Sequence, residues 1–351
     1  MTDRAPLLSV RDLVKQFPLG RGLFSRRDEA VHAIQGVSFD LGHGETLGLV
    51  GESGSGKSTI GRTIARLERP TSGHVLLDGV DLGRISDRAF RPYRKRVQMI
   101  FQDPYSSLDP RMSAGQIIEE PLVIHAVDAA ERKRRVAELL DMVGLPSAAR
   151  HRLPHEFSGG QRQRIGIARA IALNPDIVIA DEPVSALDVS IQAQVVNLLE
   201  DLQRSLSLSY LFIAHDLSVV RHLAHRVAVL YLGRIMEIAD REALYDDPCH
   251  PYTIALLQAA PIPDPKTEAA RSHQVIEGEI PSPVNPPPGC VFSSRCPLAS
   301  EQCVREVPPL VSVAPGHQVA CIKIAQARRL RADRTIGVTG VPAADTDHPG
   351  H

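Results

Sequence analysis

Short apolar runs alternate with amphipathic segments over the first two thirds of the chain. The runs suit buried strands and comprise residues 47–50, 97–101, 177–180 and 210–214. Between them, apolar residues recur at helical spacing in two segments: Val136, Leu139, Leu140 and Val143, with Gly144 as a stop, and Val195, Leu198, Leu199 and Leu202. Strands that alternate with helices predict an α/β fold.

The pattern changes toward the C-terminus. Residues 227–232, Gly233-Arg234 and residues 235–239 predict an antiparallel hairpin. Beyond it, prolines are dense between Pro261 and Pro288, four cysteines follow, and the last stretch is polar and rich in small residues. We therefore divide the chain into a main domain over residues 7–245, a small Pro/Cys-rich C-terminal extension over 246–330 and a tail over 331–351, which we expect to be disordered.

Composition narrows the class of protein. Hydrophobic residues make up 43% of the 351, ample for a packed core, and the net charge of −1 gives no reason to expect nucleic-acid binding. No apolar run reaches the roughly 20 residues that span a bilayer, and the N-terminus lacks the basic and apolar regions of a secretory signal. We expect a cytosolic chain that needs a separate partner for any role at a membrane.

The most informative motif follows the first apolar run and leads into a helical segment over residues 60–67. It consists of Gly51, Glu52, Ser53, Gly54, Ser55, Gly56, Lys57, Ser58 and Thr59. A strand, a glycine-rich loop and a helix in this order form the P-loop arrangement, in which backbone N–H groups surround phosphate oxygens. Lys57 would reach the β- and γ-phosphates, and the Ser58 hydroxyl would bind Mg²⁺.

Two acids end a later buried strand. Asp181 at the end of residues 176–181 is placed to hold Mg²⁺, and Glu182 could activate water as a general base. Without the upstream P-loop, two solvated acids would be the simpler interpretation.

A second anion site follows Phe157. Ser158, Gly159, Gly160 and Gln161 begin a basic helix, where free N–H groups and a hydroxyl favour an anion. One chain needs only one γ-phosphate cradle for one nucleotide, so a second makes sense if it faces the nucleotide of another subunit. With this motif between Lys57 and Asp181, the chain resembles the ATP-binding subunit of an ABC transporter, whose signature motif is similar to SGGQ.

The resemblance extends to other elements in the family's order. Gln102 matches the Q-loop glutamine, which by resemblance senses Mg²⁺ or the attacking water and touches the membrane subunit. Asp188 matches the D-loop at the dimer interface, and His215 the switch histidine at the γ-phosphate. Phe17 lies near the position of the aromatic that stacks on adenine, with Phe24 as an alternative.

The family implies a P-loop core with an antiparallel β subdomain and an α-helical subdomain, here over about residues 103–165. Its cofactors are ATP and Mg²⁺, and two cassettes would close head to tail around ATP. Isolated monomers would then bind ATP but hydrolyse it poorly.

Three segments resemble the ATPases of the oligopeptide and dipeptide importers: FQDPYSSLDPRM, DEPVSALDVSIQAQVVNLLEDLQ and HPYT. These importers use a pair of ATPases, and the chain is more similar to the second (F-type) than to the first. This branch implies a related ATPase partner, two permease subunits and an extracytoplasmic solute-binding protein, with the chain at the cytoplasmic face of the membrane. Importers of nickel and of glutathione share the extension, so the cargo stays open.

Four cysteines of the extension form a candidate metal site. Cys290, Cys296, Cys303 and Cys321 lie within 32 residues, and in a cytosolic chain such a set favours metal over disulfides. The spacing lacks zinc-ribbon knuckles and ferredoxin runs. Some importers of this branch hold a [4Fe–4S] cluster on similar cysteines, so the resemblance implies a cluster, with zinc or no metal as alternatives. Cys249 lies apart and is interpreted as a lone thiol.

Other classes of function fit less well. ABC ATPases of DNA repair carry coiled coils or zinc insertions between the two motifs, yet here about 100 residues without a heptad run separate them. Ribosomal types carry two cassettes, and this chain has one. The basic runs 91–96 and 131–135 are interpreted as solvated faces, and none of the fourteen histidines is assigned to a metal.

Overall fold

A computed structural model describes residues 5–19, 29–103, 105–259 and 278–332 of the chain. Its centre is an eight-stranded sheet in the order β11-β12-β10-β9-β3-β8-β7-β6. Five neighbouring strands are parallel: β3 (Thr46–Val50), β6 (Val97–Ile100), β7 (Ile177–Asp181), β8 (Ser209–Ala214) and β9 (Arg226–Tyr231). The four apolar runs thus form four adjacent buried strands, as predicted.

The parallel strands are apolar on both faces because each face covers a separate core. In β7, Val178 and Ala180 contribute to the core beneath the helices, whereas Ile177 and Ile179 contribute to the core on the opposite face. The first core is covered by α5 (Gly159–Ile171), α6 (Val189–Leu206) and α7 (Leu217–Leu223). Burial on both sides explains why these strands are continuous apolar runs rather than alternating ones.

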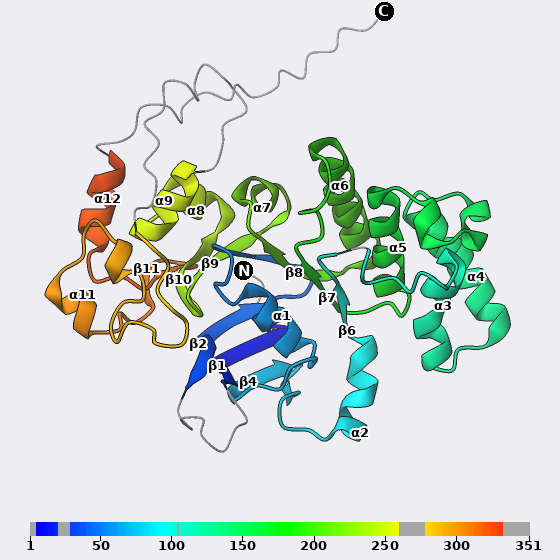
Figure 1. Ribbon diagram of the computed structural model, residues 1–351, viewed down its shortest axis with the longest axis horizontal. Helices are drawn as coiled ribbons and strands as arrows, with labels where there is room; N and C mark the ends of the chain where they lie inside the picture. The colour runs from blue at the N-terminus through cyan, green and yellow to red at the C-terminus, as the bar shows by residue number, and fades with distance from the viewer. Residues whose placement is uncertain (1–4, 20–28, 104, 260–277, 333–351) are drawn as a thin grey trace, which may run out of the picture.

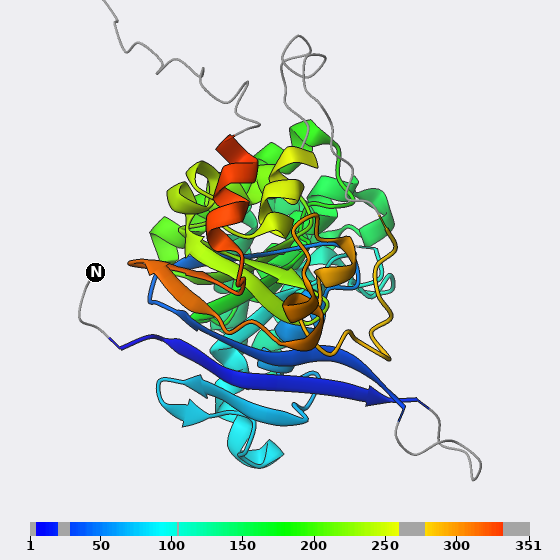
Figure 2. The same ribbon diagram turned by 90° about the vertical axis from the view of Figure 1, so that its left-hand side faces the viewer.

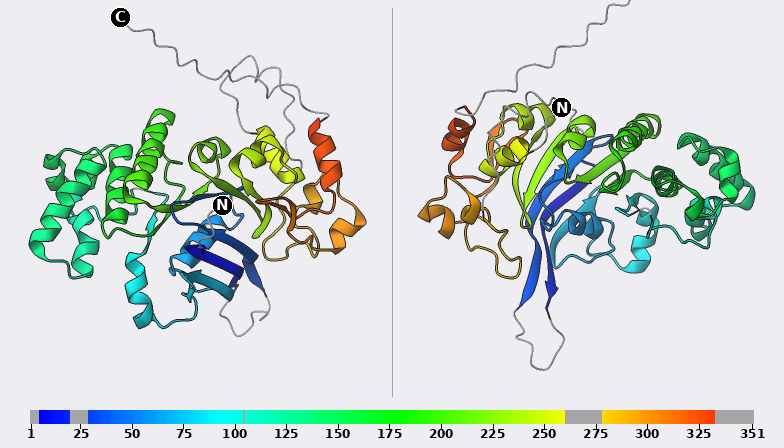
Figure 3. Two further views of the ribbon diagram at one scale, coloured as in Figure 1. Left: turned by 180° about the vertical axis from the view of Figure 1, so that it is seen from behind. Right: turned by 45° about the horizontal axis from the view of Figure 1, so that its top comes forward.

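A second, antiparallel sheet covers the other core. Its order is β2-β1-β4-β5, with β1 at Leu8–Pro18, β2 at Ala30–Leu41, β4 at Ser72–Leu77 and β5 at Val80–Asp81. Helix α1 (Lys57–Ile64) contacts β2 of this sheet as well as β7 and β8 of the main sheet (Figures 1 and 3). The P-loop at its start therefore lies where the two sheets meet.

Helices dominate the end of the molecule beyond β6 (Figure 1). They include α3 (Ala114–Ile124) and α4 (Ala129–Met142), followed in the chain by the 3₁₀ turns η2 (Ser147–His151) and η3 (Pro154–Glu156). The short helix α2 (Asp87–Phe90) and the 3₁₀ turn η1 (Arg91–Lys95) lie below β6 in Figure 1 and lead into it. Gly144 adopts a φ of 68° just after α4, which agrees with its predicted role as a stop.

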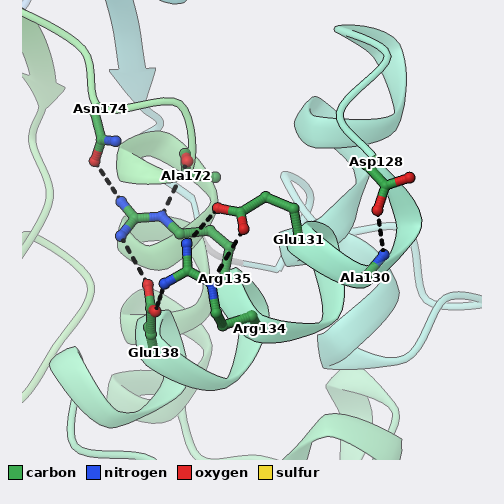
Figure 4. A network of polar contacts seen from close by, with 8 residues as sticks. All are labelled: Asp128, Ala130, Glu131, Arg134, Arg135, Glu138, Ala172 and Asn174. Carbon is green, nitrogen blue, oxygen red and sulfur yellow. Dashed lines mark hydrogen bonds and ion pairs between the residues drawn. The ribbon is translucent and has the colours of Figure 1, made fainter.

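The basic run at the start of α4 is only partly a solvated face (Figure 4). Arg134 pairs with Glu131 and Glu138 on the exposed side. Arg135, however, donates to the carbonyl oxygens of Ile171 and Ala172 at the end of α5. Its side chain therefore ties α4 to α5, and the interpretation of the whole run as solvated was wrong for this residue.

The predicted hairpin joins β9 to β10 (Arg234–Asp240). Tyr231 pairs with Arg234, so the turn residues are Leu232 and Gly233, with φ values of 44° and 76°. The turn lies one residue earlier than predicted, because Leu232 adopts a left-handed conformation that a leucine rarely takes.

The C-terminal extension continues the main sheet. Helix α8 (Arg241–Asp246) spans the boundary with the main domain. The extension itself contains α9 (Pro251–Ala259), η4 (Ser293–Arg295), α11 (Glu301–Arg305), β11 (Val311–Ala314), β12 (His317–Val319) and α12 (Ile324–Ala332). Strand β12 pairs with β10, placing Val319 opposite Glu237 (Figure 2). The extension is thus built onto the main domain through a shared sheet.

Two expectations fall outside the described segments. Residues 260–277 include much of the proline-dense stretch, and residues 333–351 include most of the predicted disordered tail. Among the helices that the structure does describe, none is both long and apolar enough to cross a membrane.

Candidate functional site

The P-loop turns between the end of β3 and the start of α1. Gly56 has a φ of 101°, and a Cβ there would lie 2.2 Å from the carbonyl oxygen of Ala33 in β2. At Gly51, with a φ of 151°, a Cβ would lie 2.0 Å from the carbonyl oxygen of Leu230. Only glycine fits at either position, because a side chain would collide with the backbone of the neighbouring strand.

Lys57 lies folded onto the loop that precedes it. Its Nζ donates to the carbonyl oxygens of Gly51 (2.8 Å) and Glu52 (2.9 Å), and the side chain is buried. Burial lowers the pKa of the ammonium, while the nearby carboxylates of Glu182 and Asp181 oppose that shift. Nζ also donates to the Ser55 hydroxyl at 3.3 Å, so all three hydrogen-bond partners are uncharged oxygens. A buried cation in this setting is suited to an anionic ligand such as phosphate.

Ser58 and Asp181 meet across the site. The Ser58 hydroxyl donates to Asp181 Oδ1 at 2.7 Å, and only 1% of Asp181 is exposed. Burial raises the pKa of this carboxyl, and the Ser58 hydrogen bond partly opposes the increase. A hydroxyl and a carboxylate in contact form a donor set that fits Mg²⁺.

Three side chains from adjacent strand ends gather beside this pair. The amide Nε2 of Gln102, just after β6, donates to Glu182 Oε2 at 2.8 Å. His215, just after β8, places Nδ1 at 3.7 Å from the same oxygen. Glu182 itself follows β7 with a φ of 46°, a conformation that costs energy for a non-glycine residue and clusters at active sites. Glu182 is thus held between two polar groups, which suits the base of a hydrolytic reaction.

Ser158 and Gln161 cap helix α5. The Ser158 hydroxyl accepts from the Gln161 N–H (3.3 Å), and the Gln161 side chain accepts from the Ser158 N–H (3.1 Å). The hydroxyl is thus engaged as a cap, and the N–H groups of Gly159 and Gly160 are left to meet a ligand. In the part of the chain that the structure describes, no hydrogen bond or ion pair joins these four residues to residues 51–59.

Of two other predicted nucleotide contacts, Asp188 is exposed and Phe17 is half-buried. Asp188 is exposed at the start of α6, next to Val189, which is 81% exposed. Phe17 of β1 pairs with Val31 of β2, on the same hairpin as the Ala33 that contacts the P-loop. Lys15 Nζ lies 4.6 Å from the Phe17 ring centroid. Phe24 falls outside the described residues.

Four cysteines of the extension line one small cavity, together with His250 and Phe292: Cys290, Cys296, Cys303 and Cys321. All four are free thiols. Burial raises the pKa of three of them: the pKa of Cys290, that of Cys296 to about 11 and that of Cys321 to about 12. These thiols are therefore protonated near neutral pH, and a metal would have to displace their protons as it binds.

The spacing of the four sulfurs bears on the kind of metal. Tetrahedral zinc–sulfur bonds of about 2.3 Å place sulfurs about 3.8 Å apart. Among the described residues, no three of these sulfurs lie within 4.8 Å of one another. The four thiols are therefore not arranged as a preformed tetrahedral zinc site.

A buried polar group that the sequence did not reveal joins the extension to β10. Glu237 accepts from the backbone N–H groups of Cys249 (2.7 Å) and His250 (2.9 Å) and contacts His317 Nε2 at 2.7 Å. Glu237, Cys249 and His317 place potential ligand atoms within 4.8 Å of one another. Cys249 is a free thiol that does not line the cavity of the other four cysteines, and its sulfur accepts from Arg328 Nε at 3.3 Å.

A parallel sheet with a glycine-rich loop opening a helix, and acids at the end of a neighbouring strand, defines a P-loop nucleoside triphosphatase. Comparisons with known proteins agree. Residues 34–185 match the family described as "ABC transporter", and residues 236–303 match "Oligopeptide/dipeptide transporter, C-terminal region".

The oligopeptide transport ATP-binding protein AppF of Bacillus subtilis is 54% identical over 321 residues, 91% of this chain and 98% of that protein. A dimeric ATP-binding cassette, MJ0796, solved with ADP and Pi, superposes with a TM-score of 0.60 at 30% identity, covering 67% of this chain and 98% of that one. CbiO1 of Clostridium perfringens shares the fold, with a TM-score of 0.61 at 24% identity, covering 70% and 92%. The chain belongs to the ABC transporter family as an ATP-binding subunit, and it is an ABC-type ATPase.

Proposed function

We propose that the chain hydrolyses ATP to drive import of di- and oligopeptides through a partner permease. The observation that carries the ATPase chemistry is the convergence of Gln102, Glu182 and His215 next to the Ser58–Asp181 pair. These groups come from distant parts of the sequence, and P-loop hydrolysis needs all of them at one phosphate.

Each residue then has a role that its geometry supports. The loop N–H groups of residues 51–59 cradle the phosphates, and Lys57 turns from its carbonyl partners to the β- and γ-phosphates. Mg²⁺ is held by Ser58, Asp181 and Gln102. Glu182 accepts the proton of the attacking water, and His215 contacts the γ-phosphate. The bound ion supplies charge neutralisation at the β- and γ-oxygens.

The second half of the site comes from another subunit. Among the described residues, no hydrogen bond or ion pair joins the segment Ser158–Gln161 to the P-loop of its own chain. Asp188 is exposed close to this segment, since Leu187 and Ile191 pack against Gly159 and Gly160. We infer that these residues meet the nucleotide of a related ATPase in a head-to-tail dimer, and that Phe17 stacks on adenine. The MJ0796 cassette, which shares 30% identity, is described as dimeric with ADP and Pi.

The membrane partners follow from the branch of the family. We infer two permease subunits and an extracytoplasmic solute-binding protein, with this chain at the cytoplasmic face. The segment after Gln102 presents Tyr105, which is 64% exposed and suited to contact a permease. The similarity to AppF, an oligopeptide transport ATP-binding protein, supports peptide as cargo over nickel or glutathione.

We further propose that residues 246–330 form an extension that holds a [4Fe–4S] cluster on Cys290, Cys296, Cys303 and Cys321. Such a cluster would supply a covalent staple between segments that are otherwise short and irregular. Anaerobic purification followed by iron, sulfide and zinc analysis tests this. About four iron atoms per chain, lost in Cys296→Ser, supports the cluster. One zinc per chain, or no metal, contradicts it.

The transport proposal is tested with the complex reconstituted in vesicles. Peptide-loaded binding protein should increase the ATPase rate severalfold over the unloaded protein. A rate that ignores peptide but responds to nickel or glutathione would assign the cargo elsewhere. Co-purification with ribosomes or nucleic acid instead of membrane subunits would contradict a transport role.

A further inference from the structure

Glu52, the second residue of the P-loop, is held by two groups of the C-terminal extension. Its backbone N–H donates to the hydroxyl of Tyr252 at 2.9 Å. Its carboxylate Oε2 accepts from Arg295 Nη1 at 2.7 Å. Tyr252 is fully buried and only 7% of the Arg295 side chain is exposed, so water competes little for either bond.

The same residue contacts the lysine that meets the phosphates. The Glu52 carbonyl accepts from Lys57 Nζ at 2.9 Å and from the Ser55 N–H at 3.2 Å. The main chain of Glu52 thus has the extension on one side and Lys57 on the other. A displacement of Glu52 would change the loop conformation from which Lys57 reaches the nucleotide.

Aromatic packing fixes the groups that hold Glu52. The ring centroid of Tyr252 lies 4.8 Å from that of Tyr231 and 5.2 Å from that of Phe292, and the latter two are 5.3 Å apart. The Tyr231 hydroxyl also accepts from Arg295 Nη1 at 3.3 Å. These edge-to-face and tilted ring contacts restrict both the Tyr252 hydroxyl and the Arg295 guanidinium.

Arg295 is also part of the chain that forms the cysteine cavity. It lies in η4, which begins after Cys290 and is followed directly by Cys296. The Ser293 N–H donates to the Cys290 carbonyl at 2.9 Å, so the turn is tied to the first cysteine as well. A change in the spacing of these two cysteines would therefore move Arg295.

We propose that Tyr252 and Arg295 are positioning residues for the nucleotide, acting through Glu52, and that the state of the cysteine cavity is transmitted to the ATP site along this path. The proposal rests on ATP binding at the P-loop. It does not depend on the cargo, the permease or the hydrolysis step, because its effect is on nucleotide affinity.

The test is titration of the purified full-length chain with a fluorescent ATP analogue. Arg295→Gln and Tyr252→Phe should each raise Kd about five- to tenfold, the effect of losing one hydrogen bond. Arg295→Lys should recover part of the affinity because it keeps the charge. Arg305→Gln is the matched control, since Arg305 pairs with Glu301 on the exposed side of α11, and it should change Kd less than about twofold.

A double variant tests whether the effect passes through Glu52. Glu52→Gln with Arg295→Gln should bind ATP no more weakly than the worse single variant, because both remove the same contact. Wild-type affinity in Arg295→Gln and Tyr252→Phe, or losses that simply add in the double variant, would overturn the positioning role. If the wild-type chain itself failed to bind the analogue, the ATP site would be contradicted instead.

The link to the cysteine cavity needs one more comparison. Removal of bound metal by a chelator, checked by iron and zinc content, should shift the Kd of the wild-type chain but not that of Arg295→Gln. An equal shift in both, or no shift in the wild type, would overturn the transmission.

Discussion

The amide of Gln102 donates a hydrogen bond to the carboxylate of Glu182, with 2.8 Å between Nε2 and Oε2. The contact joins the segment that leads into the helical end of the molecule to the proposed catalytic base. Movement of that segment, for example on docking of a permease, would alter the surroundings of Glu182. The proposed base and the segment proposed to contact a permease are therefore next to each other in the fold.

The role of Glu182 gives the first prediction. Glu182→Gln keeps the shape of the side chain but removes the base, so ATP turnover should fall at least about 100-fold while ATP still binds. Phosphate release and analogue binding measure the two effects separately. Glu200→Gln, which removes a carboxylate near His222 on the surface of α6, serves as the control. Turnover within twofold of wild type in Glu182→Gln would show that another group acts as base.

The Ser58–Asp181 pair predicts a change in the metal requirement. Asp181→Asn removes a charged Mg²⁺ ligand, so the Mg²⁺ concentration for half-maximal turnover should rise about tenfold or more. Nucleotide binding measured in EDTA should change far less, because Lys57 and the loop are intact. An unchanged Mg²⁺ dependence would exclude Asp181 as a ligand.

The signature segment predicts dependence on a second subunit. Ser158→Arg should abolish turnover yet leave ATP binding by the isolated chain unchanged, because no hydrogen bond in the described part of the chain joins Ser158 to its own P-loop. Ser113→Arg is a matched control, since Ser113 caps α3 with the same Ser/Gln box. Turnover per chain should also rise with protein concentration. Equal effects of the two substitutions, or turnover independent of concentration, would contradict the shared site.

The buried group around Glu237 predicts a pH dependence of stability. Hydrogen bonds to Cys249 and Glu237 raise the pKa of His317 from 6.5 to about 9. The folded state therefore holds a proton that the unfolded state releases between these values. The stabilisation is fully present below pH 6.5 and is lost as pH rises through 9, by about 3 kcal/mol in all.

Urea unfolding in chelator-treated buffer from pH 6 to 9.5 measures this loss. His317→Gln should be less stable at pH 6 and should show a flatter pH profile over the same range. An identical profile in the variant would mean that His317 is not protonated in the folded chain.

Some features of this fold are visible in the sequence and others are not. The four parallel strands were predictable because burial on both faces leaves uninterrupted apolar runs. The P-loop and the acids after β7 were predictable because their spacing follows from phosphate and metal chemistry. The contacts of Glu52 with Tyr252 and Arg295 were not, because the partners lie 200 and 243 positions away and belong to no periodic pattern.

The attachment of the extension shows the same limit. Strand β12 is three residues long, too short for any alternation to mark it, and its pairing with β10 depends on the chain's return from the cysteine-rich segment. Nothing in the sequence around Glu237 indicates that it is buried, because its partner His317 lies 80 positions later in the chain.

Peptide uptake in living cells is the measurement that tests whether ATP hydrolysis at this site powers peptide import. Cells that depend on this transporter would carry either the wild-type chain or Glu182→Gln, with equal amounts of the protein at the membrane, and uptake of a labelled tripeptide would be measured. If Glu182 is the base for ATP hydrolysis, tripeptide uptake should fall to background in Glu182→Gln while uptake of a free amino acid is unchanged. Undiminished tripeptide uptake in that variant would contradict the claim that ATP hydrolysis at this site powers peptide import.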